Sequence, residues 1–421
     1  MTRKAKFVLI LPILSWLIAS LFYFHQYFLR TSLSSLGAQV SEAFHLSPIG
    51  LSDLASSFYV IFIVMQIFAG ILVDRFGAKK TLVAASLICA LGSSLFTLAN
   101  TVFLLYIGRI FMGAGAAFAL IGTLTLASHW FDQKRFIIIN GLTSSLGLMG
   151  AILSEGPLAK LLLHNSWRYA MAGASIIAII ISVLIFIFIK EPKKANIKNN
   201  NSNIKDLIKG FKYLTSNIRL WLICFAMGLT YISIDTLAGL WLSPYLMQEY
   251  SITIDIAGYF SGMIFIGIAV GSIILSVISS RFTRYLIWIT SLCLFMALFF
   301  SYALIYGYWR FENLIIICFI YGVLISSIIL LVPIIRKEVD PEYIATAFSI
   351  AEFFKHLISI LSLQVVGLML GVSLHSHTSR SFVETMLNDV AAYQHALTIA
   401  PLGLLLAFMI CLFLALHDRK K

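Results

Sequence analysis

Ionisable side chains inside long apolar runs are the residues of this sequence that could do chemistry. Three are carboxylates that could bind and release a proton, Glu155, Asp235 and Glu352, and two are arginines, Arg30 and Arg109. A charged side chain costs about 3 kcal/mol to insert at the centre of a membrane-spanning helix, so each one is a functional candidate. These residue types predict proton movement and the binding of charged groups within a membrane.

Asp235 is the strongest candidate in the second half of the chain. It lies near the midpoint of an apolar run over about 219–247, and we expect it to bind and release a proton or to contact a charged ligand. Glu352, Lys355 and His356 follow at spacings that place them on one helix face, where Glu352 can neutralise Lys355. Two interpretations of this second group stay open: an internal ion pair without a further role, and a gate or relay.

Arg30 follows Gln26 and Tyr27 in the first apolar run. One interpretation makes Arg30, Tyr27 and Gln26 a binding site for an anion, because the planar guanidinium matches a carboxylate with two hydrogen bonds. The other has Arg30 reaching out to lipid headgroups. A cation from the first half and Asp235 from the second would suit a zwitterion such as an amino acid or a short peptide.

Glu155 has two interpretations as well. It could carry a proton, or it could form an ion pair with Lys160 or Arg168 near the outer end of its helix.

The composition defines the class of protein. Of the 421 residues, 60% are hydrophobic and 11% are charged, and the mean hydropathy is +0.96. Soluble domains carry roughly 25% charged residues, so the chain is predicted to be an integral membrane protein. The five cysteines lie inside apolar runs without metal-ligand spacing. We expect no metal, no cofactor and no catalytic residue, because the sequence has no Ser–His–Asp arrangement and no nucleotide-binding loop.

The apolar runs predict an all-α membrane protein with twelve transmembrane helices, each reaching the roughly 20 residues that span a bilayer. The domains are expected to be a six-helix bundle over 1–189, a cytoplasmic linker with an amphipathic helix over 190–218, and a second six-helix bundle over 219–421. The first predicted span begins at Phe7, and the others lie at about 49–73, 81–99, 101–127, 136–162, 167–189, 219–247, 254–279, 285–306, 311–335, 343–372 and 394–416.

The positive charges predict the orientation. With both termini in the cytoplasm, 23 of the 30 Lys and Arg residues fall on that side, as the positive-inside rule requires. We therefore expect a multi-pass protein of a bacterial inner membrane. The net charge of +12 is a topology signal, and no nucleic-acid partner is expected.

A charged turn over 70–80 separates the second and third runs and reads Gly70-x-x-x-Asp74-Arg75-x-Gly77-x-Lys79-Lys80. Gly77 should allow a positive backbone dihedral, and Gly70 should let another helix approach closely. This pattern resembles the loop 2–3 signature of the major facilitator superfamily. The resemblance implies a secondary transporter with two bundles of six helices that works by alternating access, in which the turn is a gating motif.

Two further segments bear on the resemblance. The segment from Arg109 to Gly113 resembles the family's helix 4 motif, which implies a buried arginine tied to proton movement; the alternative is an arginine held by helix carbonyls. The segment Leu158–Lys160 departs from the glycine-rich antiporter signature, which weakens a drug-exporter interpretation.

The predicted function is secondary active transport of a small polar solute, an organic anion or a zwitterion, by a proton-coupled symporter. Arg30 makes the chain similar to the organic-anion and sugar-phosphate carriers of the family, and the pattern of the first helix is similar to the lysosomal dipeptide transporter branch. The alternatives are a sugar-phosphate or phosphate antiporter and a non-transporting sensor on the same scaffold. The expected partners are the substrate, protons or another coupling ion, and the lipid bilayer, with the protein as a monomer.

Overall fold

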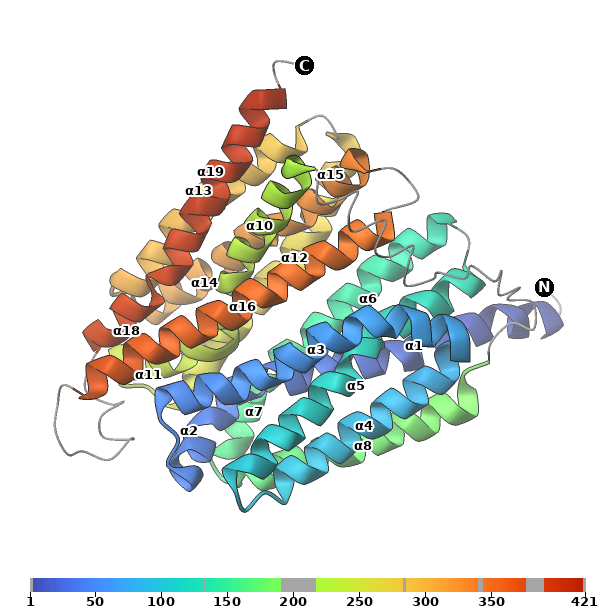
Figure 1. Cartoon of the computed structure of the whole chain (residues 1–421), viewed down its shortest axis with the longest axis horizontal. Helices are drawn as coiled ribbons and strands as arrows, with labels where there is room; N and C mark the ends of the chain where they lie inside the picture. Colours follow the sequence, from blue (N-terminus) through green and yellow to red (C-terminus); the bar gives the residue numbers. More distant parts are fainter. Residues whose placement is uncertain are drawn as a thin grey trace. The chain divides into compact units, whose positions relative to one another are not determined.

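In the computed structural model the described residues are 3–131, 133–190, 217–282, 285–339, 344–375 and 390–418. Every regular element in these ranges is a helix, shown in Figure 1. The chain forms two compact units. Residues 191–216, which carry most of the predicted linker and its amphipathic helix, lie outside the described residues.

Unit 1 comprises Met1–Phe44, Leu54–Ser154 and Leu158–Asn201. Within it, α4 packs against both α5 and α8, and α1 packs against α5, α6 and α8 (Figure 1). Two short helices, α2 and α7, follow α1 and α6. The elements are α1 (Arg3–Thr31), α2 (Leu33–Phe44), α3 (Pro48–Phe76, whose first residues belong to unit 2), α4 (Ala78–Thr97), α5 (Val102–Trp130), α6 (Gln133–Ser154), α7 (Gly156–Leu162, whose first two residues belong to unit 2) and α8 (Trp167–Phe188).

Unit 2 comprises His45–Asp53, Glu155–Pro157 and Ser202–Lys421. Within it, α10 packs against α16 and α19, α12 against α14, and α13 against α19. The elements are α10 (Ile218–Ile232), η1 (Ser233–Trp241), α11 (Leu242–Tyr250), α12 (Ile254–Arg281), α13 (Leu286–Tyr306), α14 (Phe311–Ile325), η2 (Ser326–Leu330), α15 (Leu331–Glu338), α16 (Ile344–His375), α18 (Val390–Leu397) and α19 (Ile399–Asp418).

The predicted membrane-spanning helices are confirmed. Ten helical stretches in the described ranges are long and apolar enough to cross a membrane. Helices α1 and α6, with 29 and 22 residues, also reach the required length. Together they account for all twelve predicted spans, and their ends fall close to the predicted ones.

In the described part of unit 2 three spans are interrupted, and each interruption lies just before a proline. The π-helix η1 ends three residues before Pro244, the 3-10 helix η2 ends three residues before Pro333, and α18 ends four residues before Pro401. Proline has no backbone N–H and its ring clashes with the carbonyl four residues earlier, so the preceding turn departs from α-helical geometry. The interruption at η1 places Asp235 in a widened turn.

Candidate functional site

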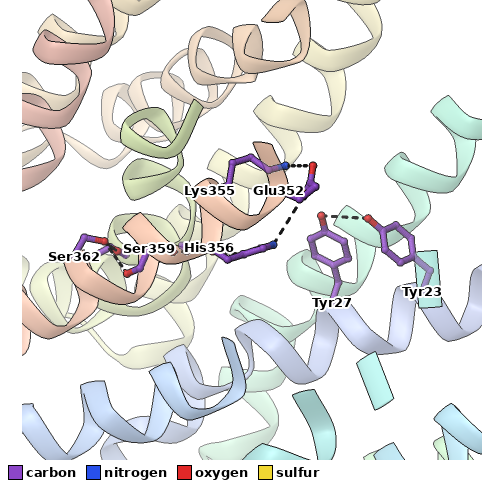
Figure 2. Close-up of polar contacts among 9 residues, drawn as sticks. Tyr23, Tyr27, Glu352, Lys355, His356, Ser359 and Ser362 are labelled. Atoms are coloured by element: carbon purple, nitrogen blue, oxygen red, sulfur yellow. Dashed lines mark hydrogen bonds and ion pairs between the residues drawn. The ribbon is translucent and has the colours of Figure 1, made fainter. Parts of the chain in front are cut away.

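Arg30 is buried in unit 1, with 4% of its surface exposed. Its guanidinium carbon lies 4.0 Å from the centroid of the Tyr27 ring, and the Tyr23 and Tyr27 hydroxyls are 3.5 Å apart (Figure 2). Gln26 of the same helix is also buried. Such burial does not fit an arginine that reaches for headgroups, and it places a desolvated cation on α1.

Hydrogen bonds fix the backbone around Arg30. The Thr31 and Ser154 hydroxyls are 2.6 Å apart, and the Ser35 hydroxyl donates to the Ser154 carbonyl at 2.8 Å. These contacts join the end of α1 and the start of α2 to the end of α6.

Arg109 also acts on this part of α1. Its Nη1 donates to the Leu29 carbonyl at 2.8 Å and its Nε to the Leu54 carbonyl at 3.4 Å. The residue is 2% exposed. Gly113 permits the contact with α3, since a Cβ there would lie 2.3 Å from the Phe58 carbonyl oxygen. Helix carbonyls thus accept both of these hydrogen bonds from Arg109, and its role in proton movement stays a prediction.

Asp235 in η1 meets two side chains of α16. The Ser359 hydroxyl donates to its Oδ2 at 2.8 Å, and His356 Nδ1 lies 3.7 Å from the same oxygen. Asp235 is 1% exposed. Next to it, the Thr236 and Ser362 hydroxyls are 2.5 Å apart. A buried carboxylate is stable only when such groups compensate its lost hydration.

Glu352 extends this polar cluster along α16. Lys355 Nζ lies 2.5 Å from Glu352 Oε1, which confirms the predicted ion pair, and His356 Nε2 lies 4.0 Å from Glu352 Oε2. Figure 2 shows Lys355 and His356 both directed toward Glu352. From α10, the Tyr231 ring packs edge-on against His356 at 5.5 Å and lies 4.9 Å from Lys355 Nζ.

Glu155 is fully buried and packs with unit 2. Its Oε2 lies 3.5 Å from the Ser243 hydroxyl, which is 2.8 Å from the Ser261 hydroxyl. Lys160 is exposed, and Arg168 donates to the Ala99 carbonyl at 2.6 Å. The structure thus places Glu155 in a different environment from Asp235, beside hydroxyl groups of α11 and α12.

The turn between α3 and α4 has the predicted backbone. Gly77 has φ 86°, and the Thr81 hydroxyl donates to its carbonyl at 2.6 Å. Arg75 and Lys80 are exposed, and Lys79 Nζ lies 5.4 Å from the Phe186 ring. The close helix approach predicted at Gly70 is wrong, because a Cβ there would meet no heavy atom within 4 Å among the described residues. The side chain of Asp74 lies outside the described residues.

Two residues next to Asp235 were not predicted to contact it, His356 and Ser359. The signal was present, because Glu352, His356 and Ser359 repeat at the spacing of one helix face. What the spacing could not show was that this face of α16 meets η1.

The fold and the buried polar groups define a multi-pass membrane transporter, a class whose members are not enzymes. The chain belongs to the Major Facilitator Superfamily, whose family model matches residues 16–363. It is 25% identical over 291 residues to a hexuronate transporter of Bacillus subtilis, covering 66% of this chain and 68% of that relative. It is 22% identical over 282 residues to a lysosomal dipeptide transporter of Danio rerio, covering 63% of this chain and 61% of that relative.

The solved structures agree on the fold. A bacterial homologue of the human lysosomal transporter Spinster, in an inward-facing and unoccupied conformation, superposes with a TM-score of 0.79 at 13% identity. The match covers 95% of this chain and 97% of that one. At this identity the likeness establishes the shared twelve-helix fold and nothing about the substrate.

Proposed function

We propose that this protein is a proton-coupled secondary transporter of a small organic anion or zwitterion, working by alternating access. The observation that carries the proposal is the burial of two opposite charges on membrane-spanning helices, Arg30 in unit 1 and Asp235 in unit 2. Ionisable residues are retained at such depth where they bind a substrate or move an ion. Transporters of this kind place their sites near the midplane of the bilayer.

A carboxylate on the substrate fits Arg30 best. The guanidinium is stacked on Tyr27 and offers a planar fork that matches two carboxylate oxygens. A hexuronate and a dipeptide, the substrates named for two relatives, both carry a carboxylate. We assign Gln26 and Tyr27 to the same site as neighbouring polar groups, and Asp235 to a cationic group of the substrate or to the coupling proton.

The remaining candidates receive different roles in the proposal. Asp235 and Glu352 lie in one polar cluster with His356 and are assigned to proton coupling. Glu155 is a further carboxylate for that step, while Arg109 positions the α1 backbone next to Arg30. The turn from Gly70 to Lys80 acts as the gating motif.

The proposal also includes the placement of the chain. The bundles are 1–189 and 219–421, joined by a cytoplasmic linker over 190–218, in a monomer of a bacterial inner membrane with both termini in the cytoplasm. The excess of Lys and Arg on one side supports this orientation.

Uptake into proteoliposomes tests the proposal. Labelled D-glucuronate and labelled L-alanyl-L-alanine would be supplied on the acidic side of a pH gradient. A thermal-shift screen of sugar acids, amino acids, short peptides and sugar phosphates would widen the choice of probe. We expect accumulation of at least one carboxylate probe, and its loss when a protonophore collapses the gradient. If no probe is accumulated or exchanged, the chain is a sensor; if sugar phosphates alone exchange, it is an antiporter of that class.

A further inference from the structure

The polar cluster of unit 2 contains one histidine between two carboxylates. His356 Nδ1 lies 3.7 Å from Asp235 Oδ2, and its Nε2 lies 4.0 Å from Glu352 Oε2. Neutral imidazole has one protonated nitrogen and one free nitrogen, so it can accept a proton on one side and give one up on the other. Both separations are ion-pair distances longer than a hydrogen bond, and they place the histidine between the two carboxylates, in the order that a relay requires.

The charges of the cluster point to a single mobile proton. Glu352 and Lys355 neutralise each other at 2.5 Å, which leaves Asp235 and His356. Both side chains are almost completely buried, at 1% and 2% exposure. An ionised Asp235 beside a protonated His356 forms an ion pair, and the attraction within such a pair offsets part of the cost of burying its charges. The pair is electrically balanced only when it holds one proton, shared as a coupled unit.

The exposures of the two carboxylates give the relay a direction. The Glu352 side chain is 38% exposed, whereas His356 is 2% exposed. A proton from water therefore reaches Glu352 first, passes to His356, and is then held against Asp235. The groups that face His356 within unit 2 include Tyr231 of α10, Asp235 of η1 and Glu352 of α16. Lys355 lies at the edge of this cluster, where it pairs with Glu352 and contacts the Tyr231 ring.

Ser359 positions the carboxylate of Asp235, which accepts the proton from His356. Its hydroxyl donates at 2.8 Å to Oδ2 of Asp235, the same oxygen that faces His356. The spacing of His356 and Ser359 places them on one face of α16, so a single helix surface fixes both contacts.

We propose that His356 is the proton-carrying residue of the transport cycle, receiving the proton through Glu352 and sharing it with Asp235. This inference rests on the proposed function, in which coupling to protons was assigned to the carboxylates alone. It makes the coupling ratio one proton for each cycle, and it makes Ser359 a positioning residue.

The first experiment measures the charge of His356 without any substrate. Nitrogen NMR of the full chain in lipid nanodiscs, with labelled histidine, would follow the nine imidazoles between about pH 5 and pH 8, the range in which histidine changes its charge. The His356 signal is the one lost in His356→Gln. We expect it to change charge in the wild type and to stay neutral over this range in Asp235→Asn. A His356 signal that never changes charge in the wild type would overturn the proposal.

The second experiment measures coupling in proteoliposomes with D-glucuronate or L-alanyl-L-alanine, whichever the wild type accumulates, at zero membrane potential. A pH difference of one unit supports about tenfold accumulation for each coupled proton. We expect about tenfold in the wild type and no accumulation in His356→Gln, with counterflow exchange kept and no longer dependent on pH.

The matched control is His25→Gln. His25 is also buried, but on α1, where Nε2 lies 2.9 Å from the Ala174 carbonyl oxygen, and we expect its variant to remain coupled.

Full accumulation by His356→Gln would overturn the proposal. If His356→Gln does not fold, Glu352→Gln is used instead and is expected to slow gradient-driven uptake; an unchanged rate would overturn the relay. Failure of the wild type to move either probe would instead contradict the proposed function, and the NMR result would still decide the proton site.

Discussion

The stacking of Arg30 on Tyr27 leads to a prediction about substrate binding. A lysine at this position keeps the positive charge but cannot make the two parallel hydrogen bonds of the guanidinium fork. We expect Arg30→Lys to weaken binding of a carboxylate substrate about tenfold to hundredfold, and Arg30→Ala to weaken it further. Equilibrium binding of the labelled probe to purified protein measures the effect.

Arg168→Lys is the matched control for Arg30→Lys. Arg168 also lies over an aromatic ring, with its guanidinium 4.2 Å from the centroid of Trp167. Because Arg168 donates to a helix-end carbonyl and has no part in the proposed site, its variant should bind the probe normally. Equal affinity of the wild type and Arg30→Lys would exclude the anion site on α1.

Arg109 has a structural consequence that its variants should reveal. It donates to the carbonyls of Leu29 and Leu54 and so joins α5 to α1 and α3. Arg109→Met keeps the apolar stem and removes both donors, and we expect the free energy of unfolding to fall by about 1–3 kcal/mol. Equilibrium unfolding in detergent measures this change in the free energy of unfolding. Arg168→Met, which loses a part-buried hydrogen bond, is the variant for comparison. An unchanged free energy of unfolding would contradict the structural role of Arg109 and favour its direct role in proton movement.

The candidate residues could be chosen from the sequence because a charge in an apolar run is visible there. Their pairing could be predicted at one end of the cluster and not at the other. Glu352 and Lys355 are close along one helix, so spacing predicts their contact. Asp235 and His356 are 121 positions apart, and nothing local indicates that η1 packs against this face of α16.

At the scale of elements, hydropathy predicted the spans well because each must cross the same apolar thickness. The interruptions inside the spans were not predicted. Pro244, Pro333 and Pro401 are visible in the sequence, yet Pro12 lies within α1 without a break. A proline removes one hydrogen bond, and the packing around it decides whether the preceding turn becomes π-helical, 3-10 or kinked.

Pro244 therefore provides a prediction about η1. The Leu242 N–H donates to the Leu237 carbonyl, five residues earlier, which is the pattern of a π-helix. Pro244→Ala restores an N–H and allows η1 to become an ordinary α-helix. This change shifts the helical register, and a shift of one residue rotates a side chain by about 100° around the helix axis. We expect Asp235 to leave His356 and Ser359, and coupled uptake to fall sharply while thermal stability is kept or raised.

Pro333→Ala and Pro401→Ala serve as controls for this change. They remove the same constraint from spans that carry none of the assigned site residues, so their uptake should stay near the wild-type rate. The histidine NMR signal of Pro244→Ala gives a readout without substrate. An unchanged His356 signal together with normal uptake would show that η1 does not depend on the proline.

At the scale of the whole molecule, alternating access requires two end states of similar stability. In our proposal the turn between α3 and α4 favours one of them through Asp74. Loss of one partner of a buried charge pair can cost about 3–5 kcal/mol, which is enough to shift the population almost completely. We expect Asp74→Asn to fold and to transport much less. Asp53→Asn on the same helix is the control, and normal uptake by Asp74→Asn at normal expression would contradict the gating role.

The orientation of the whole chain can be measured across one helix. Helix α4 has 20 residues, about 30 Å at the rise of an α-helix, so its ends lie on opposite sides of the membrane. Lys80 and Asn100 are exposed near these two ends. The positive-inside rule places Lys80 in the cytoplasm. In intact bacterial cells, a membrane-impermeant maleimide should label Asn100→Cys and should label Lys80→Cys only after the cells are opened.

The native cysteines do not obscure this result, because Cys89, Cys224, Cys318 and Cys411 are buried and Cys293 is part-buried. The unsubstituted protein gives the background. An even number of spans puts both termini on the same side as each other. Two predicted spans, formed by α1 and α3, separate the N-terminus from Lys80. The N-terminus therefore lies on the same side of the membrane as Lys80. Labelling of Lys80→Cys in intact cells would therefore place both termini outside and reverse the direction of every proton step proposed above.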